Sequence, residues 1–252
     1  MKGSLLRLPL RPGFSLTLLS LLFLAVPADA QNFRIDVTGG DPNADFGVAI
    51  QLVVAMTLLT LGPSVIMMMT TFTRIVIVLG FVRNAVGVNA APSSQIIIGV
   101  ALFLTFFLMG PVWNRIYEDA VVPYMADEMR SGDALETANT HMKDFMLNQT
   151  RRADVNFFLE LSRQGAMTRD ELPLSIVVPS FVLSELRTAF QMGFLIFIPF
   201  IIVDFIVASS LMSMGMMMMP PVVISMPFKL LLFVLVDGWY LVVQSLVDSF
   251  NV

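Results

Sequence analysis

Three ionisable residues interrupt the most apolar part of the sequence. Asp204 and Lys229 each lie within a run of aliphatic and aromatic side chains, and Asp237 follows in the last apolar segment. A charge in such surroundings costs several kcal/mol unless it is paired or hydrated, so these residues mark a place of pairing or of ion and proton movement. Asp204 and Lys229 lie equally far in sequence from the middle of a methionine-rich stretch. If an antiparallel hairpin turns there, the two side chains meet; in the alternative, Lys229 extends to the membrane interface and Asp204 meets another subunit or water.

The methionine-rich stretch holds six methionines in eight positions, namely Met212, Met214, Met216, Met217, Met218 and Met219. Methionine is unbranched and polarisable, so a run of it forms an apolar surface that deforms around objects of different shape. Pro220 and Pro221 follow and would fix the re-entry of the chain into a helix. Copied around a symmetric ring, the loop would form a soft constriction that excludes water and ions. The alternative is a flexible filler between helix ends. We favour the constriction, which requires an oligomer.

Other chemistry is poorly represented in the sequence. There is no cysteine and His141 is the only histidine, which excludes thiolate chemistry and a histidine-rich metal cluster within one chain. A hydrolase triad lacks a base beside its nucleophile, and no glycine-rich phosphate-binding motif is present. The formal net charge of −4 provides no basic surface for nucleic acid. We therefore expect no enzyme, no cofactor, no metal site and no nucleic-acid partner.

The elements that must position these residues are membrane helices. Hydrophobic residues make up 56% of the chain and charged residues 13%, against roughly 45–50% and about 25% in soluble domains. We predict an all-α fold with about four long apolar helices in two hairpins, at 46–69, 94–113, 190–212 and 225–247. Arg74 and Arg83 in the connection between the first two helices, without an acidic residue, agree with a cytoplasmic location. We divide the chain into a signal peptide at 1–30, a short periplasmic segment at 31–45, a first membrane pair at 46–113, a periplasmic helical segment at 114–187 and a second membrane pair at 188–252.

The first thirty residues have the pattern of a secretory signal peptide. Lys2, Arg7 and Arg11 precede an apolar run at 14–26, and small residues around Ala30 form a cleavage pattern. An uncleaved first span is the alternative, but this run falls short of the roughly 20 apolar residues that a bilayer requires. We expect cleavage after about Ala30.

The periplasmic segment shows two amphipathic patterns, at 133–147 and 153–164, which predict helices. Asp154, Phe157 and Phe158 lie in the second of them. These side chains could anchor a neighbouring protein, although aromatic residues at helical spacing more often form a local core.

Three motifs of this sequence resemble the FliP family of type III secretion export apparatus proteins. They are FTRIVIVLGFVRNA at 72–85, PSFVLSELRTAFQMGF at 179–194, and MSMGMMMMPP at 212–221 followed by the PFK that ends at Lys229. The resemblance implies a core pore-forming subunit of the flagellar export gate, in the bacterial inner membrane at the flagellar basal body. It also implies assembly with FliQ-like and FliR-like subunits into a roughly five-fold channel, with a homopentameric ring of this chain, through which unfolded flagellar proteins pass.

The resemblance also assigns roles to residues. It implies that the methionine loop is a gasket that seals the pore, and that Glu185, Asp204 and Lys229 occupy charged positions linked to assembly and export. We group Arg74, Arg187 and Phe157 with these assembly or export residues. In this family, apolar segments can be lifted partly out of the bilayer, so predicted helices need not equal bilayer crossings. The alternative function is a small ion-coupled secondary transporter that uses the charges within apolar sequence, although no inverted repeat supports it.

Overall fold

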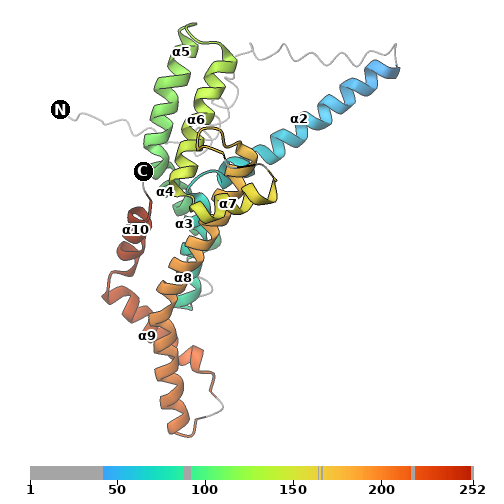
Figure 1. The fold of residues 1–252 in the computed structure, drawn as a ribbon. Coiled ribbons are helices and arrows are strands. Elements are labelled where there is room, and N and C mark those ends of the chain that lie inside the picture. The colour runs from blue at the N-terminus through green and yellow to red at the C-terminus, as the bar shows by residue number, and fades with distance from the viewer. Residues whose placement is uncertain (1–41, 88–91, 164, 166, 217–218, 251–252) are drawn as a thin grey trace, which may run out of the picture. The chain divides into compact units, whose positions relative to one another are not determined.

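The computed structural model describes residues 42–87, 92–163, 165, 167–216 and 219–250, and within these ranges the chain is helical, without a strand (Figure 1). The predicted all-α fold is confirmed for this part of the chain. The predicted signal peptide at 1–30 lies outside the described residues, as do Met217 and Met218. The helices, including the π-helix η2, are α2 (Pro42–Met68), α3 (Phe72–Val86), α4 (Ser94–Ile116), η2 (Tyr117–Val121), α5 (Val122–Met125), α6 (Ser131–Gln149), α7 (Arg152–Leu161), α8 (Leu174–Ser213), α9 (Pro221–Leu235) and α10 (Gly238–Asp248).

The chain divides into two units, residues 1–59 and residues 60–252. The described part of the first unit is the first portion of α2, and the contacts and sites described below lie within the second unit.

Two helical stretches among the described residues are long and apolar enough to cross a membrane. They are Ser94–Met125, which continues from α4 through η2 into α5, and Leu174–Ser213, which is α8. The pair α9 and α10 would make a third if it is one span, but it is bent by 63°. The apolar part of α2, Ile50–Gly62, is shorter. The prediction of about four long apolar helices is therefore confirmed in part. Helix α2, at 27 residues, covers nearly all of the first predicted helix at 46–69, whereas the fourth predicted helix is broken between α9 and α10.

Helix α3 occupies the connection that the sequence predicted between the first two apolar helices. Ile75, Val78, Leu79 and Val82 are at most 1% exposed, and their spacing places them on one face of a helix. This face packs against α8 and α4. Although it is short, α3 forms the centre of the main apolar core.

Helix α8 is shared between two different environments. Near its start, Ile176, Val177 and Phe181 are buried in a core with residues of α4 and α6. Further along, Leu195 is 65% exposed and Phe205 is 71% exposed. At 40 residues, the helix is about 60 Å long, twice the roughly 30 Å thickness of a hydrocarbon core. One half therefore belongs to the folded polar segment, and the other half is an apolar helix with little cover.

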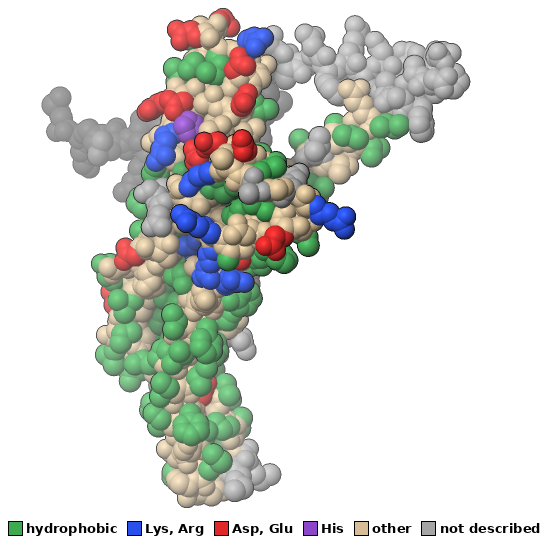
Figure 2. Space-filling model, viewed as in Figure 1, with side chains coloured by type: hydrophobic (Ala, Val, Ile, Leu, Met, Phe, Trp, Pro, Cys, Tyr) green, Lys and Arg blue, Asp and Glu red, His purple; other side chains and the backbone are tan. Residues whose placement is uncertain are grey.

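The charged side chains follow this division. Figure 2 shows acidic and basic side chains gathered over the segment with α5, α6 and α7, whereas the lower parts of α8 and α9 present a nearly uncharged surface.

The two amphipathic helices predicted at 133–147 and 153–164 are confirmed as α6 and α7. The predicted start of the third apolar helix at 190 is too late, because α8 begins at Leu174 and continues through Pro179.

Candidate functional site

The methionine-rich loop joins α8 to α9 at the end of a helical hairpin (Figure 1). Gly215 has φ of 76°, and its N–H donates to the carbonyl of Met212 at 3.1 Å, while the N–H of Met216 donates to the carbonyl of Leu211 at 3.0 Å. These two bonds form a Schellman motif, which needs a residue with positive φ and therefore favours glycine. Pro220 and Pro221 then start α9, where the fixed φ of proline suits the first turn of a helix. The local sequence thus sets both ends of the loop.

The described methionines of this loop are all open to the surroundings. Met214 is 71% exposed, Met212 is 58% exposed, and Met216 and Met219 are 40% exposed each. Met217 and Met218 lie outside the described residues. In a single chain, the thioether side chains at the end of the hairpin are therefore available for contact with other molecules.

A polar triad ties the two helices of the hairpin together. The Nζ of Lys229 on α9 donates to Oδ2 of Asp204 on α8 at 2.6 Å, and Ser225 Oγ donates to the other carboxylate oxygen. Lys229 and Ser225 are buried, whereas the Asp204 side chain is 32% exposed. The intrachain pair predicted from the equal sequence distances is present. Ser225, four residues before Lys229 and so on the same face of α9, was not predicted to take part.

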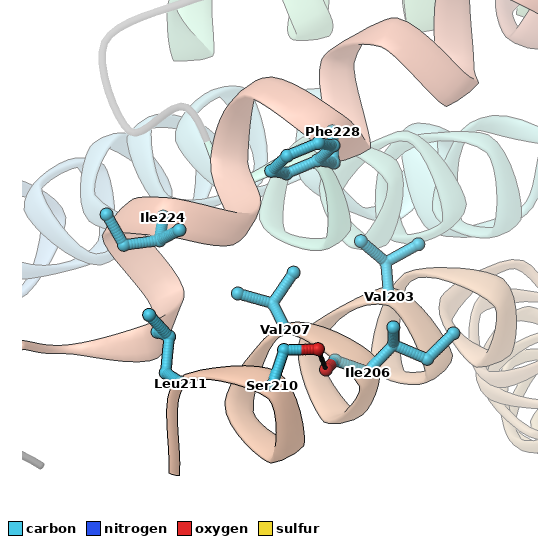
Figure 3. A pocket seen from close by; sticks show the side chains of 7 residues that line it. All are labelled: Val203, Ile206, Val207, Ser210, Leu211, Ile224 and Phe228. Atoms are coloured by element: carbon cyan, nitrogen blue, oxygen red, sulfur yellow. Dashed lines mark hydrogen bonds between the residues drawn. The ribbon is translucent and has the colours of Figure 1, made fainter. Parts of the chain in front are cut away.

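The apolar contact between the same two helices is incomplete. A cavity of about 430 Å³ lies between them on the loop side, lined from α8 and α9. Figure 3 shows Val203 and Val207 of α8 directed toward Ile224 and Phe228 of α9 across this cavity. Close packing is missing here, so the alignment of the two helices depends on the triad and on Phe200 of α8, which packs against Phe233 of α9 with 6.2 Å between the ring centroids.

Asp237, the third predicted charge, does not join this site. It lies between α9 and α10, is exposed, and has φ of 51°, a left-handed conformation that aspartate tolerates better than most residues. It therefore marks the break in the predicted fourth helix, which is not a continuous span.

A second ion pair lies at the other end of α8. Arg74 of α3 donates to Glu185 through Nε, at 2.8 Å from Oε2, and through Nη2 to the other oxygen. Its Nη1 donates to the carbonyl oxygen of Ser249 at 2.8 Å and to the hydroxyl of the same residue at 3.0 Å. The guanidinium also stacks 3.9 Å from the ring centroid of Phe250. Both charged side chains are almost completely buried, at 3% and 0% exposed. Arg74 thus joins α3, α8 and the C-terminal end of α10 at one point.

The two remaining predicted residues lie where α7 crosses α8. The guanidinium of Arg187 is 3.7 Å from Oδ1 of Asp154, which is buried, while Arg187 is half exposed. The other oxygen of Asp154 has no hydrogen-bond partner among the described residues. Phe157 is 52% exposed and stacks edge-on against Phe158. Phe157 is thus open to a partner, and Asp154 is part of the packing between α7 and α8.

The predicted residues therefore fall into separate groups. Asp204 and Lys229 meet near the methionine loop, Arg74 and Glu185 meet at the far side of the core, and Arg187 lies beside α7. Ser249 and Phe250 complete the second group, and no local pattern in the sequence identified them, because they contact Arg74 from 175 residues away. Within the described residues, no group of three or more His, Asp and Glu side chains is arranged to hold a metal ion.

Comparison with known proteins places these features in a family. A sequence model described as FliP family matches residues 55–246. Relatives with the name flagellar biosynthetic protein FliP include one from Buchnera aphidicola subsp. Acyrthosiphon pisum, 51% identical over 212 residues that cover 84% of this chain but only 56% of the relative. The protein from Pectobacterium carotovorum is 47% identical over 92% of this chain and 91% of its own length. The protein from Bacillus subtilis is 48% identical over 87% of this chain and all of its own length.

Proposed function

Because the chain belongs to the FliP family, we propose that it is a core pore-forming subunit of the flagellar type III protein export gate. As a member of this family, it is a structural component of the flagellar export apparatus and not an enzyme. In the finer proposal, several copies surround a channel, and the methionine loops seal it at rest and close softly around an unfolded protein during passage.

The observation that carries this proposal is the construction of the α8 and α9 hairpin. Its end carries exposed methionines, and its two helices are joined by a polar triad. A channel for unfolded proteins must accept side chains of every kind, so a constriction of fixed shape would penalise many of them. Flexible thioether side chains adapt to different shapes, and an apolar ring of them opposes the passage of ions.

The surface of the single chain supports an assembly with partners. Phe194, Ile202 and Phe205 on α8 are between 53% and 71% exposed, and Leu235 of α9 is 74% exposed. A surface of this kind belongs against lipid or other subunits. We propose a homopentameric ring, completed by FliQ-like and FliR-like subunits, in the bacterial inner membrane at the flagellar basal body.

The ion-coupled transporter is the weaker candidate. It requires an ionisable group that binds and releases its ion in apolar surroundings. Asp204 and Lys229 instead neutralise each other, and Asp237 is exposed at the helix break. Two of the charges that motivated this alternative thus form a structural contact in the single chain.

Replacement of Met216 to Met219 by alanine tests the gasket. The complete gate is purified with its partner subunits and placed in planar lipid bilayers, and its ion conductance is measured without an export substrate. We expect assembly to remain intact and resting conductance to rise, because alanine leaves the constriction wider and unfilled. The control is Met125→Ala, since Met125 is 74% exposed but lies at the end of α5. Unchanged conductance in a correctly assembled gate would refute the gasket.

A further inference from the structure

Both helices of the hairpin are weakened at the same level. Pro199 lies inside α8, where proline removes the hydrogen bond to the carbonyl of Leu195 and clashes with the preceding turn. On the other side, α9 ends at Leu235 and α10 begins at Gly238, with a bend of 63° between them. A cavity of about 340 Å³ connects the two places, because Pro199, Val236 and Gly238 all line it.

The bend between α9 and α10 is built from two unusual residues. Asp237 adopts the left-handed conformation, which costs energy for any residue with a side chain. Gly238 is covered by the ring of Phe233 so closely that a Cβ atom there would overlap the ring. Trp239 in turn packs edge-on against Phe233, with 5.2 Å between the ring centroids. The break is thus a defined elbow with its own packing, and not a frayed helix end.

The segments on either side of this level are tied differently. We call the described residues 200–216 and 219–235 the gate arm, whose end carries Met212, Met214, Met216 and Met219. Inside the arm, Asp204, Ser225 and Lys229 hold its two helices together. On the other side of the hinge level, Arg74 binds both Glu185 of α8 and Ser249, which follows α10. Polar contacts therefore fix both sides. At the level between them, Phe200 and Phe233 pack against each other at the edge of the main core, next to a missing backbone bond, an elbow and the cavity.

We propose that Pro199 and the elbow at 236–238 form a hinge about which the gate arm turns as a unit, which moves the methionine loop away from the channel axis. The inference rests on the proposed function, since it gives the mechanism by which that gate opens. Because both helices are weakened at the same level, the arm can turn there; if either helix were continuous and regular, it would prevent the turn. The polar triad keeps the arm's own helices aligned while it turns. Pro199, Asp237 and Gly238 are thus positioning residues for the gate.

Pro199→Ala tests the hinge, because alanine restores the backbone hydrogen bond and stiffens α8. We expect export of flagellar proteins to fall by roughly tenfold or more. Replacing an interior proline by alanine shifts the equilibrium between the bent and the regular helix toward the regular helix by more than that factor, so the arm turns less often. Resting conductance and ring assembly are expected to be unchanged. The matched control is Pro179→Ala in the same helix, in the half that packs into the polar segment. Normal export by the correctly assembled Pro199→Ala gate would overturn the hinge.

A reversible cross-link tests the same motion without a change in helix stiffness. Leu232 of the arm and Ser245 of α10 line the hinge cavity, and the chain has no cysteine of its own. Cysteines at these two positions are joined by a short bismaleimide that contains a cleavable disulfide, in a gate whose partner subunits lack cysteine. Export is expected to stop and to recover after reduction. The control pair is Val207→Cys with Ile224→Cys, which joins the arm to itself across its own cavity and is expected to leave export intact.

The outcomes separate this inference from the proposed function. If the alanine variants of the methionine loop leak but both hinge tests leave export unchanged, the gasket stands and the hinge is wrong. If the methionine variants do not leak, the gasket itself is wrong, whatever the cross-link does. If Pro199→Ala fails to assemble, the cross-link alone decides, and export that continues through the cross-linked gate refutes the hinge.

Discussion

The Asp204 and Lys229 pair gives the most quantitative prediction about the hairpin. Lys229 is almost fully buried, with 4% of its side chain exposed, whereas the Asp204 side chain is 32% exposed. Its carboxylate also accepts a hydrogen bond from Ser225. Asp204→Ala therefore leaves a buried ammonium without its carboxylate. Removal of one partner from a buried ion pair costs about 3–5 kcal/mol, or roughly two to nearly four powers of ten in an equilibrium constant.

Lys229→Ala is expected to cost less than Asp204→Ala. The remaining carboxylate is partly hydrated and keeps its bond from Ser225, so less of its charge is left without a partner. The double variant Asp204→Leu with Lys229→Met leaves no unpaired charge, and we expect it to recover most of the lost stability. The single variants are expected to impair export as well. Exchange of the two charges re-forms the pair with its polarity reversed, so it is expected to restore part of the export that the single variants lose.

The assay is a double-mutant cycle on the purified complex. Thermal unfolding and protease resistance report the stability of the hairpin, and swimming motility reports export. Asp248→Asn is the control, because Asp248 is an exposed acidic residue at the end of α10, outside the hairpin and the hinge. Equal losses for the two single variants, with simple additivity in the double variant, would show that the side chains are not coupled and would refute the reasoning.

Two further predictions concern the packing of the core. Gly193→Ala places a Cβ atom 2.5 Å from the ring of Phe81, so we expect a loss of about 1–3 kcal/mol through overpacking; thermal unfolding checks this against Gly80→Ala, where no atom lies within 4 Å. Phe250→Ala removes a ring that covers the Arg74 guanidinium and is itself buried in the main core, and we expect a loss of about 3–5 kcal/mol with faster proteolysis at the C-terminal end. Phe250→Leu keeps most of the apolar contact without the ring, and we expect a loss of about 0.5–2 kcal/mol; equal proteolysis of Phe250→Leu and the wild type would contradict the role of the stacking contact.

Local periodicity and symmetry in the sequence predicted part of the fold and part of the site. Helices α6 and α7 follow from apolar residues at helical spacing, because each has one face against the core and one face in solvent. The contact between Asp204 and Lys229 follows from equal distances to a turn that the prolines define. Both inferences use information that lies within a few tens of residues.

The features that were missed depend on contacts between distant parts of the chain. For the connection between the first two apolar helices, the positive charge predicted only a cytoplasmic location and no helix, yet the connection contains α3. Arg74 of this helix pairs with Glu185, which is 111 residues away. Pro179 favours a helix end when the sequence is considered alone, but α8 continues through it because the surrounding residues pack into a core with α4 and α6. Tertiary packing decided these cases against local preference.

The break in the fourth predicted helix had a local signal that apolar composition concealed. Asp237 and Gly238 are adjacent, and such a pair favours a turn even between apolar runs. Their effect extends beyond the elbow, because the bend carries α10 to the place where Ser249 meets Arg74. A straight helix from α9 would point these last residues elsewhere and would leave the Nη1 donors of a buried guanidinium without acceptors, at a cost of about 1–3 kcal/mol or more. The bend at one end of the gate arm and the buried arginine at the far end of α10 therefore depend on each other.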